Sequence, residues 1–287
     1  MTADSYGRMI VDVLGLLPKA RGPLAVFGCA WHHRHLLLRL TEREVEMQFR
    51  GSLLGKVWAA IVPLIMLGMY TFVFGIVLRV KWPGMEGGPL QVSLLYFAGL
   101  ILFNFFFECV NRAPALLLEN VPYIKKVIFP LEILPWVIVG AALFRATISG
   151  VILLAFYLVI KGVPPLATLS LPLLILPLAI VALGLAWILS ALGIFVRDVR
   201  QAMIVVAPAM MFLSPIFFPL SSVPEALRPV LYLNPLTFIV ETVRDALFLG
   251  LWPNWLGLAA YTGLAWLLAW AGFAWFMSAR RGFADVV

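Results

Sequence analysis

Three residues near the start of the first apolar stretch have the types that a phosphate-binding loop needs. They are Gly51, Gly55 and Lys56, in the segment FRGSLLGKVWAAIVPL. A P-loop follows the pattern G-x-x-x-x-G-K-[ST], with a hydroxyl after the lysine to ligate magnesium. In this chain three residues separate the glycines, and Val57 follows Lys56. The spacing and the missing hydroxyl exclude a nucleotide site of this type.

The three histidines of the chain cluster in the segment WHHRH, as His32, His33 and His35. No carboxylate accompanies them at ligand spacing, and two cysteines, Cys29 and Cys109, are too few for a multi-cysteine metal site. We favour an interfacial basic cluster. A leucine lies five positions after each histidine, so the H-x-x-x-x-D motif is absent, and no two aspartates lie two positions apart. We therefore predict no metal site and no catalytic residue, and we expect that the chain is not an enzyme.

The composition predicts a membrane protein. Of 287 residues, 63% are hydrophobic and 12% are charged, and the mean hydropathy is +1.02. Soluble domains carry about 25% charged residues. The net charge of +7 could suggest a nucleic-acid partner, but the basic residues are spread along the chain beside apolar stretches. We interpret them as topology-setting charges and expect no nucleic-acid partner.

The apolar stretches predict an all-α polytopic protein with six transmembrane helices. A helix needs roughly 20 residues to cross the bilayer core. The predicted spans are 57–79, 91–111, 133–160, 169–195, 202–219 and 255–277. The fifth is the weakest, because it contains Pro208 and Pro215. We divide the chain into a cytoplasmic N-terminal segment, 1–56, and a transmembrane domain with a short tail, 57–287.

The distribution of Lys and Arg predicts the orientation of these spans. With both termini in the cytoplasm, fifteen Lys and Arg lie on the inner side and five, including Arg228 and Arg244, on the outer side. Cytoplasmic loops carry the excess of positive charge. We therefore expect a multi-pass protein with both termini cytoplasmic, and no signal peptide is visible near its start.

The segment before the first span predicts an amphipathic helix that lies in the membrane plane at the cytoplasmic surface. Apolar residues alternate there with the charged residues Arg39, Glu42, Arg43, Glu46 and Arg50. Thr41 could cap this helix, with Glu44 completing a capping box.

The loop between the fifth and sixth spans, about 220–254, predicts two short helices. Ser222 to Glu225 has the pattern of a capping box, and Asn234 could cap a second helix that begins at Pro235 and ends before Gly250. Both are too short to cross the bilayer alone. We predict a re-entrant helical hairpin that enters from the outer face, and the alternative is a pair of interfacial helices.

Polar residues inside spans are functional candidates, because burying them in lipid is costly. Arg145 lies near the middle of the third span, where it contacts either an anionic substrate or a structural partner. Glu108 is about one turn from the cytoplasmic face, so we expect it to extend toward water. Asn104 lies a turn deeper and could form an interhelical hydrogen bond.

Aromatic residues in the first two spans are candidates for lining a sugar path, since aromatic faces stack on the apolar faces of sugar rings. Packing or lipid contact is the alternative for each of them. Together with the polar candidates, the predicted channel residues are Tyr70, Tyr96, Phe103, Asn104, Phe106, Phe107 and Arg145.

Four segments, in this order, carry a resemblance to a known family. They are TEREVEMQFRGSLLGKVWAAIVPL, ENVPYIKKVIFPLEILP, RDVRQ and SPIFFPLSSVPEALRPVLYLNPLTFIVETVRDALFLG. Together they resemble the membrane subunit of polysaccharide-exporting ABC transporters, the O-antigen, capsule and teichoic-acid export permeases of the type-2 ABC exporter superfamily. The resemblance extends from about Leu40 to Arg281.

The resemblance implies a division of labour between chains. The permease would form a homodimer in the bacterial inner membrane, with two copies of a separate ATPase chain that binds ATP and magnesium. The absent P-loop is consistent with this expectation. The substrate would be a lipid-linked polysaccharide that passes through a channel at the dimer interface, and envelope-spanning export proteins could be further partners.

The resemblance also implies roles by position. The coupling loop toward the ATPase would contain Asn120, Val121, Pro122, Tyr123, Ile124, Lys125 and Lys126. The Arg39–Arg50 helix would form the cytoplasmic interface or gate. The hairpin would form the outer gate, with Pro219, Pro224, Tyr232, Asn234 and Pro235 as candidates.

Other functions remain open from the residues alone. An exporter of a drug or a small lipid belongs to the same superfamily. An integral membrane glycosyltransferase or acyltransferase is a different class, but its paired carboxylates or His–Asp motif do not occur. A passive channel would be distinguished by the absence of a neighbouring ATPase gene.

Overall fold

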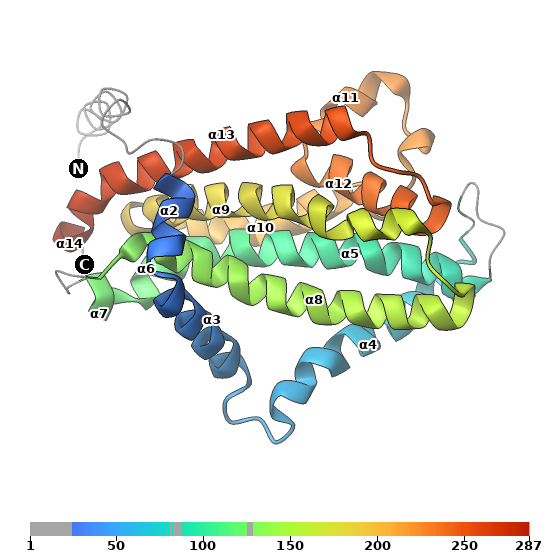
Figure 1. The fold of residues 1–287 in the computed structure, drawn as a ribbon, viewed down its shortest axis with the longest axis horizontal. Helices are drawn as coiled ribbons and strands as arrows, with labels where there is room; N and C mark the ends of the chain where they lie inside the picture. The colour runs from blue at the N-terminus through green and yellow to red at the C-terminus, as the bar shows by residue number, and fades with distance from the viewer. Residues whose placement is uncertain (1–24, 81, 83–87, 125–128, 287) are drawn as a thin grey trace.

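The regular structure of the chain is helical throughout the residues that the computed structural model describes, which are 25–80, 82, 88–124 and 129–286 (Figure 1). The α-helices are α2 (Ala25–His32), α3 (Arg34–Phe49), α4 (Trp58–Tyr70), α5 (Pro89–Arg112), α6 (Leu116–Glu119), α7 (Val121–Ile124), α8 (Leu134–Lys161), α9 (Leu171–Phe195), α10 (Asp198–Leu213), α11 (Arg228–Tyr232), α12 (Pro235–Arg244), α13 (Trp255–Ala279) and α14 (Phe283–Val286). Single turns of 3-10 helix lie at Gly55–Val57, Ala113–Ala115, Leu131–Ile133, Leu166–Ser170, Leu220–Ser222, Glu225–Leu227 and Arg280–Gly282, and π-helical segments lie at Thr71–Val77 and Asp245–Leu249.

Five helical stretches in the described residues are long and apolar enough to cross a membrane. They correspond to the predicted spans 1, 2, 3, 4 and 6, and lie at Gly55–Val77, Leu90–Glu119, Leu131–Lys161, Leu166–Phe195 and Trp255–Gly282. The second is largely buried by the others, whereas the first is almost entirely exposed. Figure 1 shows why, since α4 diverges from the bundle and forms a V with α3.

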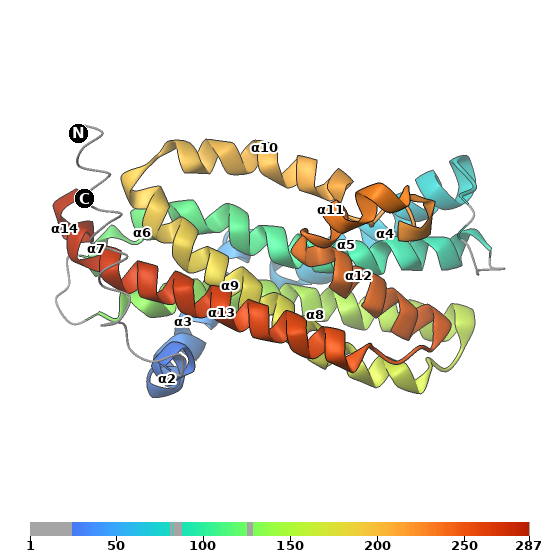
Figure 2. The same cartoon turned by 90° about the horizontal axis from the view of Figure 1, so that it is seen from above.

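The fifth predicted span, 202–219, corresponds to the shorter helix α10. Its 16 residues extend about 24 Å at 1.5 Å per residue. The backbone becomes extended at Ser214, directly before Pro215, which ends the helix because a proline disfavours helical geometry in the preceding residue. Figure 2 shows α10 lying lengthwise along the bundle. The count of six spans stays a prediction.

Small residues bring the last span close to the fourth. A Cβ atom added to Gly272 of α13 would overlap the carbonyl oxygen of Gly184 of α9, and one added to Gly184 would lie 2.9 Å from the Cα atom of Ala269. Helices in membranes use such residues to let their backbones approach. Next to this crossing, the indole N–H of the fully buried Trp187 donates to the carbonyl oxygen of Glu132 at 3.1 Å.

The helix before the first span begins earlier than predicted. Helix α3 starts at Arg34 and continues through Thr41, so Thr41 is not a cap and that prediction is wrong. Leu40 packs on Ile133 and Val137. This contact holds the turn that precedes Thr41 in helical geometry, so the helix begins before the predicted cap. The side chain of Thr41 instead packs closely on Gly140 of α8.

The predicted capping residues are confirmed for the second helix of the hairpin and wrong for the first. The Asn234 side chain accepts a hydrogen bond from the backbone N–H of Leu236 at 3.0 Å, Pro235 begins α12, and Gly250 has φ +70°. Ser222 does not cap the next turn. It ends one 3-10 turn, and the extended Val223 separates it from the turn that begins at Glu225.

Arg244, which was counted among the outer-loop charges, is buried at the base of the hairpin. Its guanidinium donates to the carbonyl oxygens of Leu95, Pro215 and Ile216, and it lies 4.9 Å from the centroid of the Trp82 ring. Its burial was not predicted from the sequence, and its position on the outer side stays a prediction. Helix α12 packs on α5, and the irregular backbone after α10 supplies carbonyls that a buried cation can satisfy.

We predict that Gly272→Val destabilises the protein and that Gly263→Val, in the same helix, does not. A side chain at position 272 must push α13 away from Gly184, whereas a Cβ at position 263 meets nothing within 4 Å. We expect a loss of at least about 3 kcal/mol for the first change, at the upper end of overpacking costs, and a change within about 0.5 kcal/mol for the second. Thermal unfolding of the purified variants measures this, and equal midpoints would contradict the proposed crossing.

Candidate functional site

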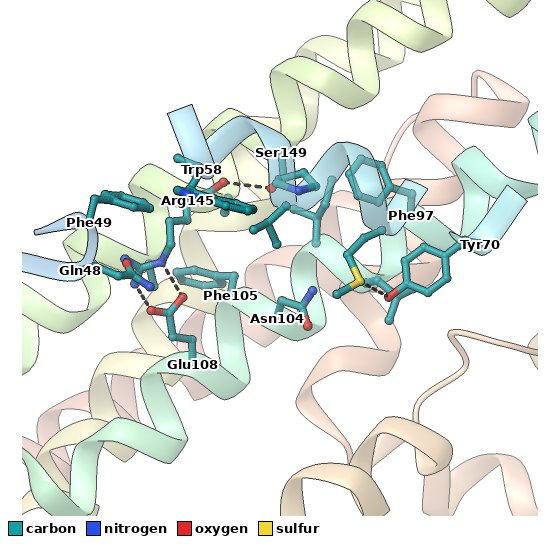
Figure 3. Close-up of a pocket in the computed structure, with 18 residues that line it drawn as sticks. Gln48, Phe49, Trp58, Tyr70, Phe97, Asn104, Phe105, Glu108, Arg145 and Ser149 are labelled. Carbon is teal, nitrogen blue, oxygen red and sulfur yellow. Dashed lines mark hydrogen bonds and ion pairs between the residues drawn. The ribbon is translucent and has the colours of Figure 1, made fainter. Parts of the chain in front are cut away.

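A cavity of about 200 Å³ lies where α4 diverges from the bundle, between α3, α4, α5 and α8 (Figure 3). Three of the seven predicted channel residues line it, namely Tyr70, Asn104 and Arg145. Aromatic side chains form much of its wall, and its polar lining comes from several helices. The other polar lining residues are Gln48, Glu108 and Ser149, and the other aromatic ones are Phe49, Trp58, Phe97 and Phe105.

Arg145 of α8 is held by an ion pair. Its Nε donates to Glu108 Oε2 at 2.8 Å and its Nη2 to Glu108 Oε1, while its Nη1 donates to Gln48 Oε1 at 2.5 Å. Arg145 therefore has protein partners in this structure. Because the guanidinium also lines the cavity, contact with a substrate stays a prediction.

We predicted that Glu108 extends toward water, but its carboxylate instead pairs with Arg145. It faces α8, where the Arg145 guanidinium lies, and about a quarter of its side chain is exposed. The cost of holding a cation between two spans is offset when a carboxylate shares the site and further hydrogen bonds complete it. The sequence did not predict this pair because hydropathy does not tell which sides of two neighbouring helices face each other.

Asn104 is exposed in the cavity, although its neighbours on α5 are buried. No interhelical hydrogen bond of its side chain is observed among the described residues, so the predicted role stays open. In Figure 3, Asn104 lies between the Arg145 ion pair and Tyr70, whose hydroxyl contacts the Met66 sulfur at 3.8 Å. An exposed amide at this depth is available to a hydroxyl-bearing ligand or to water.

The remaining predicted channel residues lie in the interior of the chain. Tyr96 is fully buried, and its hydroxyl donates to the carbonyl oxygen of Phe217 at 3.4 Å. Phe103, Phe106 and Phe107 are also buried in the main core. The structure thus places these four side chains in helix packing and separates them from the cavity that contains Tyr70, Asn104 and Arg145.

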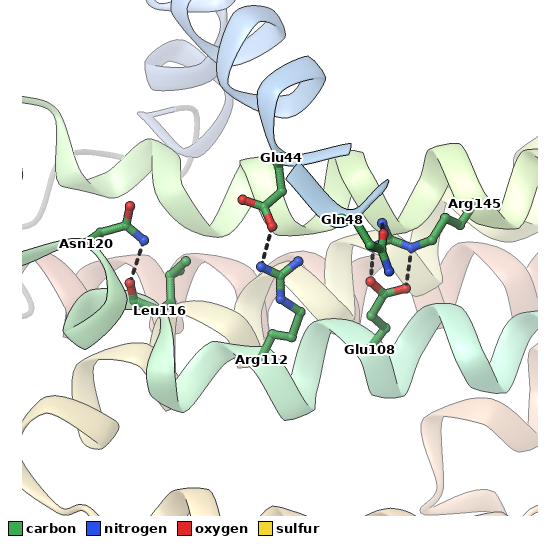
Figure 4. Close-up of polar contacts among 7 residues, drawn as sticks. All are labelled: Glu44, Gln48, Glu108, Arg112, Leu116, Asn120 and Arg145. Carbon is green, nitrogen blue, oxygen red and sulfur yellow. Dashed lines mark hydrogen bonds and ion pairs between the residues drawn. The ribbon is translucent and has the colours of Figure 1, made fainter. Parts of the chain in front are cut away.

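Polar contacts tie the interface helix α3 to the bundle (Figure 4). Glu44 pairs with Arg112 of α5, and Gln48, one turn later, reaches Arg145. Arg43 donates to the Tyr123 hydroxyl at 2.7 Å. Figure 4 shows the first two contacts in a row along α5. Glu44 and Gln48 are four residues apart, a spacing that places them on one face of a helix, yet neither was predicted as an interface residue.

The five predicted residues of the interface helix are all exposed, and Arg43 and Glu46 make polar contacts with other side chains. Arg43 contacts Tyr123, and Glu46 accepts a hydrogen bond from Lys56 at 2.9 Å. Lys56 follows a turn in which Gly51 and Gly55 have φ of +83° and +51°. The stretch that resembled a phosphate loop is thus the turn into the first span. The three others are Arg39, Glu42 and Arg50.

The predicted coupling loop forms the short helix α7. Tyr123 stacks on Phe129 with 4.2 Å between ring centroids, and Ile124 is buried, while Pro122 is exposed. Asn120 donates to the carbonyl oxygen of Leu116 at 2.8 Å directly before Val121, where α7 begins. Lys125 and Lys126 lie outside the described residues.

A contact that the sequence did not predict fixes the far end of this loop. Arg280, which follows α13, donates to Glu132 Oε2 at 2.7 Å and to the carbonyl oxygen of Phe129 at 3.1 Å. Glu132 is almost completely buried, so its charge needs this partner. The loop is thereby attached at Tyr123 to α3 and at Glu132 to the end of the last span.

At the hairpin, two of the five predicted gate residues make contacts with other elements. Asn234 donates to Ser214 Oγ at 2.7 Å, and the carbonyl oxygen of Pro235 accepts from the Tyr261 hydroxyl at 2.9 Å. Pro224 and Tyr232 are exposed, and Pro219 is partly buried. Among the described residues, no group of three or more His, Cys, Asp or Glu is placed to hold a metal ion.

Comparisons with known proteins identify relatives along most of the chain. The pattern of a family described as "ABC-2 type transporter" matches residues 35–248, from α3 to the end of the hairpin. The chain is 25% identical over 259 residues to "O-antigen export system permease protein RfbA" of Myxococcus xanthus, covering 90% of this chain and 97% of that protein. It is 25% identical over 256 residues to the protein of the same name from Klebsiella pneumoniae, covering 88% and 95% of the two chains. It is 24% identical over 217 residues to "Polysialic acid transport protein KpsM" of Escherichia coli, covering 72% and 79%.

We predict that Glu108→Leu destabilises the protein by about 2 kcal/mol, because it leaves the Arg145 guanidinium without its carboxylate. The double variant Glu108→Leu/Arg145→Met removes both charges and should recover most of that loss, since an apolar pair can replace a buried ion pair. Glu119→Leu, at an exposed carboxylate, is the control. Thermal unfolding of the purified variants measures these changes in stability. If the losses of stability of the two single variants add up in the double variant, the two side chains do not act as a pair.

Proposed function

Since the chain belongs to the ABC-2 type transporter family, we propose that it is the membrane permease subunit of an ATP-driven exporter of lipid-linked polysaccharide, of the O-antigen or capsule type. The observation that carries the proposal is the match to three export permeases or transport proteins named for O-antigen or polysialic acid, two of them over nearly their whole length. Five apolar helical stretches support a multi-pass membrane protein. The relatives are transport subunits, which supports a non-enzymatic role.

ATP and magnesium would bind to a separate ATPase chain, present in two copies beneath a permease homodimer in the bacterial inner membrane. The exposed Pro122 on α7 supports an ATPase contact at this end of the bundle. Figure 1 places α2, α6, α7 and α14 near the same end, which supports a cytoplasmic location for all of them. Envelope-spanning export proteins would act at the opposite end.

The contacts of α3 suggest how movement of the ATPase reaches the membrane. A displacement of α7 acts on Arg43 through the Tyr123 hydroxyl, and the same helix holds Arg145 through Gln48. ATP binding shifts the equilibrium between two permease states by its different affinity for them. The interface helix then links the coupling loop to the cavity without an intervening flexible segment.

The polar lining of the cavity fits a hydroxyl-rich ligand. A sugar chain cannot cross hydrocarbon unless protein or water satisfies its hydroxyl groups. Asn104 and the Tyr70 hydroxyl offer hydrogen-bonding groups, and the ring of Trp58 offers a flat apolar face. We therefore assign the sugar-contacting role to this cavity in preference to the buried aromatic residues of α5.

The proposal is tested by reconstituting the chain in proteoliposomes with a candidate ATPase, sought among the genes that neighbour its own. We expect lipid-linked glycan to become accessible to an external glycosidase only with hydrolysable ATP. A catalytically inactive ATPase is the control. ATP-dependent movement of a drug or a short-chain phospholipid, with no movement of glycan, would overturn the polysaccharide assignment and favour the other branch of the family.

In the same assay, we predict that Tyr123→Phe lowers ATP-driven transport by up to roughly tenfold, which corresponds to ~1.4 kcal/mol. The phenyl ring can still stack on Phe129, but the acceptor of the Arg43 hydrogen bond is lost. Arg43→Leu should have a similar effect, and the two changes should not be additive. Arg34→Leu, an exposed change on the same helix, is the control. Full transport in both single variants would show that this contact does not transmit movement.

A further inference from the structure

A second and larger groove lies on another side of the bundle, between α8 and α9. Its volume is about 440 Å³, and its floor comes from α5 and from the hairpin residues Val243 and Leu247. Small residues create it, because Ala98, Gly150 and Ala179 leave space that larger side chains would fill. Its walls are formed by residues between Leu143 and Leu154 of α8 and between Leu171 and Ala179 at the start of α9.

The side chains that line this groove offer no hydrogen-bonding group without a partner. Thr147 is the one residue with a polar side chain among those that line it, and its Oγ1 donates to the carbonyl oxygen of Leu143 at 2.8 Å. A bound water needs two to four polar partners, so the groove favours an apolar occupant. A sugar or an ionic ligand would lose its hydration there without compensation.

The position of the groove determines which apolar occupant is available. Both of its walls belong to candidate membrane spans, Leu131–Lys161 and Leu166–Phe195. Val151 and Leu176, which line it, are 62% and 57% exposed, so the groove is open at the outer surface of two candidate spans. Hydrocarbon chains of lipids surround that surface at this depth.

We propose that this groove is a binding site for one hydrocarbon chain of a membrane phospholipid. The inference rests on the chain spanning a membrane and does not depend on the export function. A bound chain fills the gap between α8 and α9 and contacts Val243 and Leu247. The groove thereby distinguishes one lipid molecule from the others that merely surround the protein.

The bound chain also contacts the part of the hairpin that other bonds hold in place. Val243 precedes Arg244, whose guanidinium holds the backbone after α10, and the carbonyl oxygen of Leu247 accepts a hydrogen bond from Tyr157 of α8 at 2.8 Å. An occupied groove supports the packing of α12 against α9 and the contact of Leu247 with α8. The lipid is therefore a structural partner of the predicted outer gate.

The test uses the full chain in nanodiscs that contain a phosphatidylethanolamine with a photoactivatable diazirine on one acyl chain. After illumination, mass spectrometry locates the labelled residues. We expect labelling of the 143–154 and 171–179 segments to exceed severalfold that of Ile204 and Val205, which are exposed on α10. Equal labelling of all exposed spans would show only surrounding lipid and overturn the proposal.

Gly150→Phe provides the matched test of occupancy. A Cβ at position 150 meets nothing within 4 Å, so a phenyl ring can enter the groove, and Gly263→Phe places the same ring on the exposed face of α13 as the control. We expect Gly150→Phe to reduce labelling of the groove severalfold and Gly263→Phe to leave it unchanged. Unchanged labelling in both variants would overturn the proposal. If Gly150→Phe does not fold, Thr147→Phe is the second variant, and the wild-type labelling pattern remains decisive in either case.

Discussion

Cations inside this helical bundle must find acceptors within the protein, and the way they do so connects the helices. Arg145 joins α8 to α5 and α3, Arg244 joins α12 to α5 and to the backbone after α10, and Arg280 joins the end of α13 to the loop before α8. An unpaired charge at these depths would cost several kcal/mol. Each arginine therefore restricts the helices around it to arrangements that keep its partners in reach.

The position of the candidate cavity follows from this pattern. Helix α4 is the span with the fewest neighbours, so its divergence from the bundle leaves the cavity open along α5 and α8. Helix α3 closes one end of it through Gln48, and the same helix reaches the coupling loop through Arg43. The cavity and the loop proposed to meet the ATPase are thus both in contact with helix α3.

Local sequence patterns predicted the helices of the fold, whereas contacts between residues far apart in the sequence determine the geometry of the candidate site. Hydropathy located five spans, and the Asn234, Pro235 and Gly250 signals located the helix of the hairpin, because each depends on residues within one turn. The pairing of Glu108 with Arg145 joins residues 37 positions apart, and the Arg244 contact with Leu95 spans 149. Charge counting treated Arg244 as an outer-loop residue for this reason. The aromatic residues of α5 were equally ambiguous, since packing and sugar stacking require the same side chains.

The irregular backbone after α10 has a consequence for any opening of the hairpin. The carbonyl oxygens of Pro215 and Ile216 are satisfied by Arg244, and Ser214 by Asn234, so other protein groups pair the polar groups at the end of α10. Moving α12 away would leave these groups without partners, which costs several kcal/mol each in an apolar environment. Water or other polar groups of the protein must then replace the lost partners. Any opening of the hairpin therefore requires that the space behind it becomes hydrated or is filled by other polar groups.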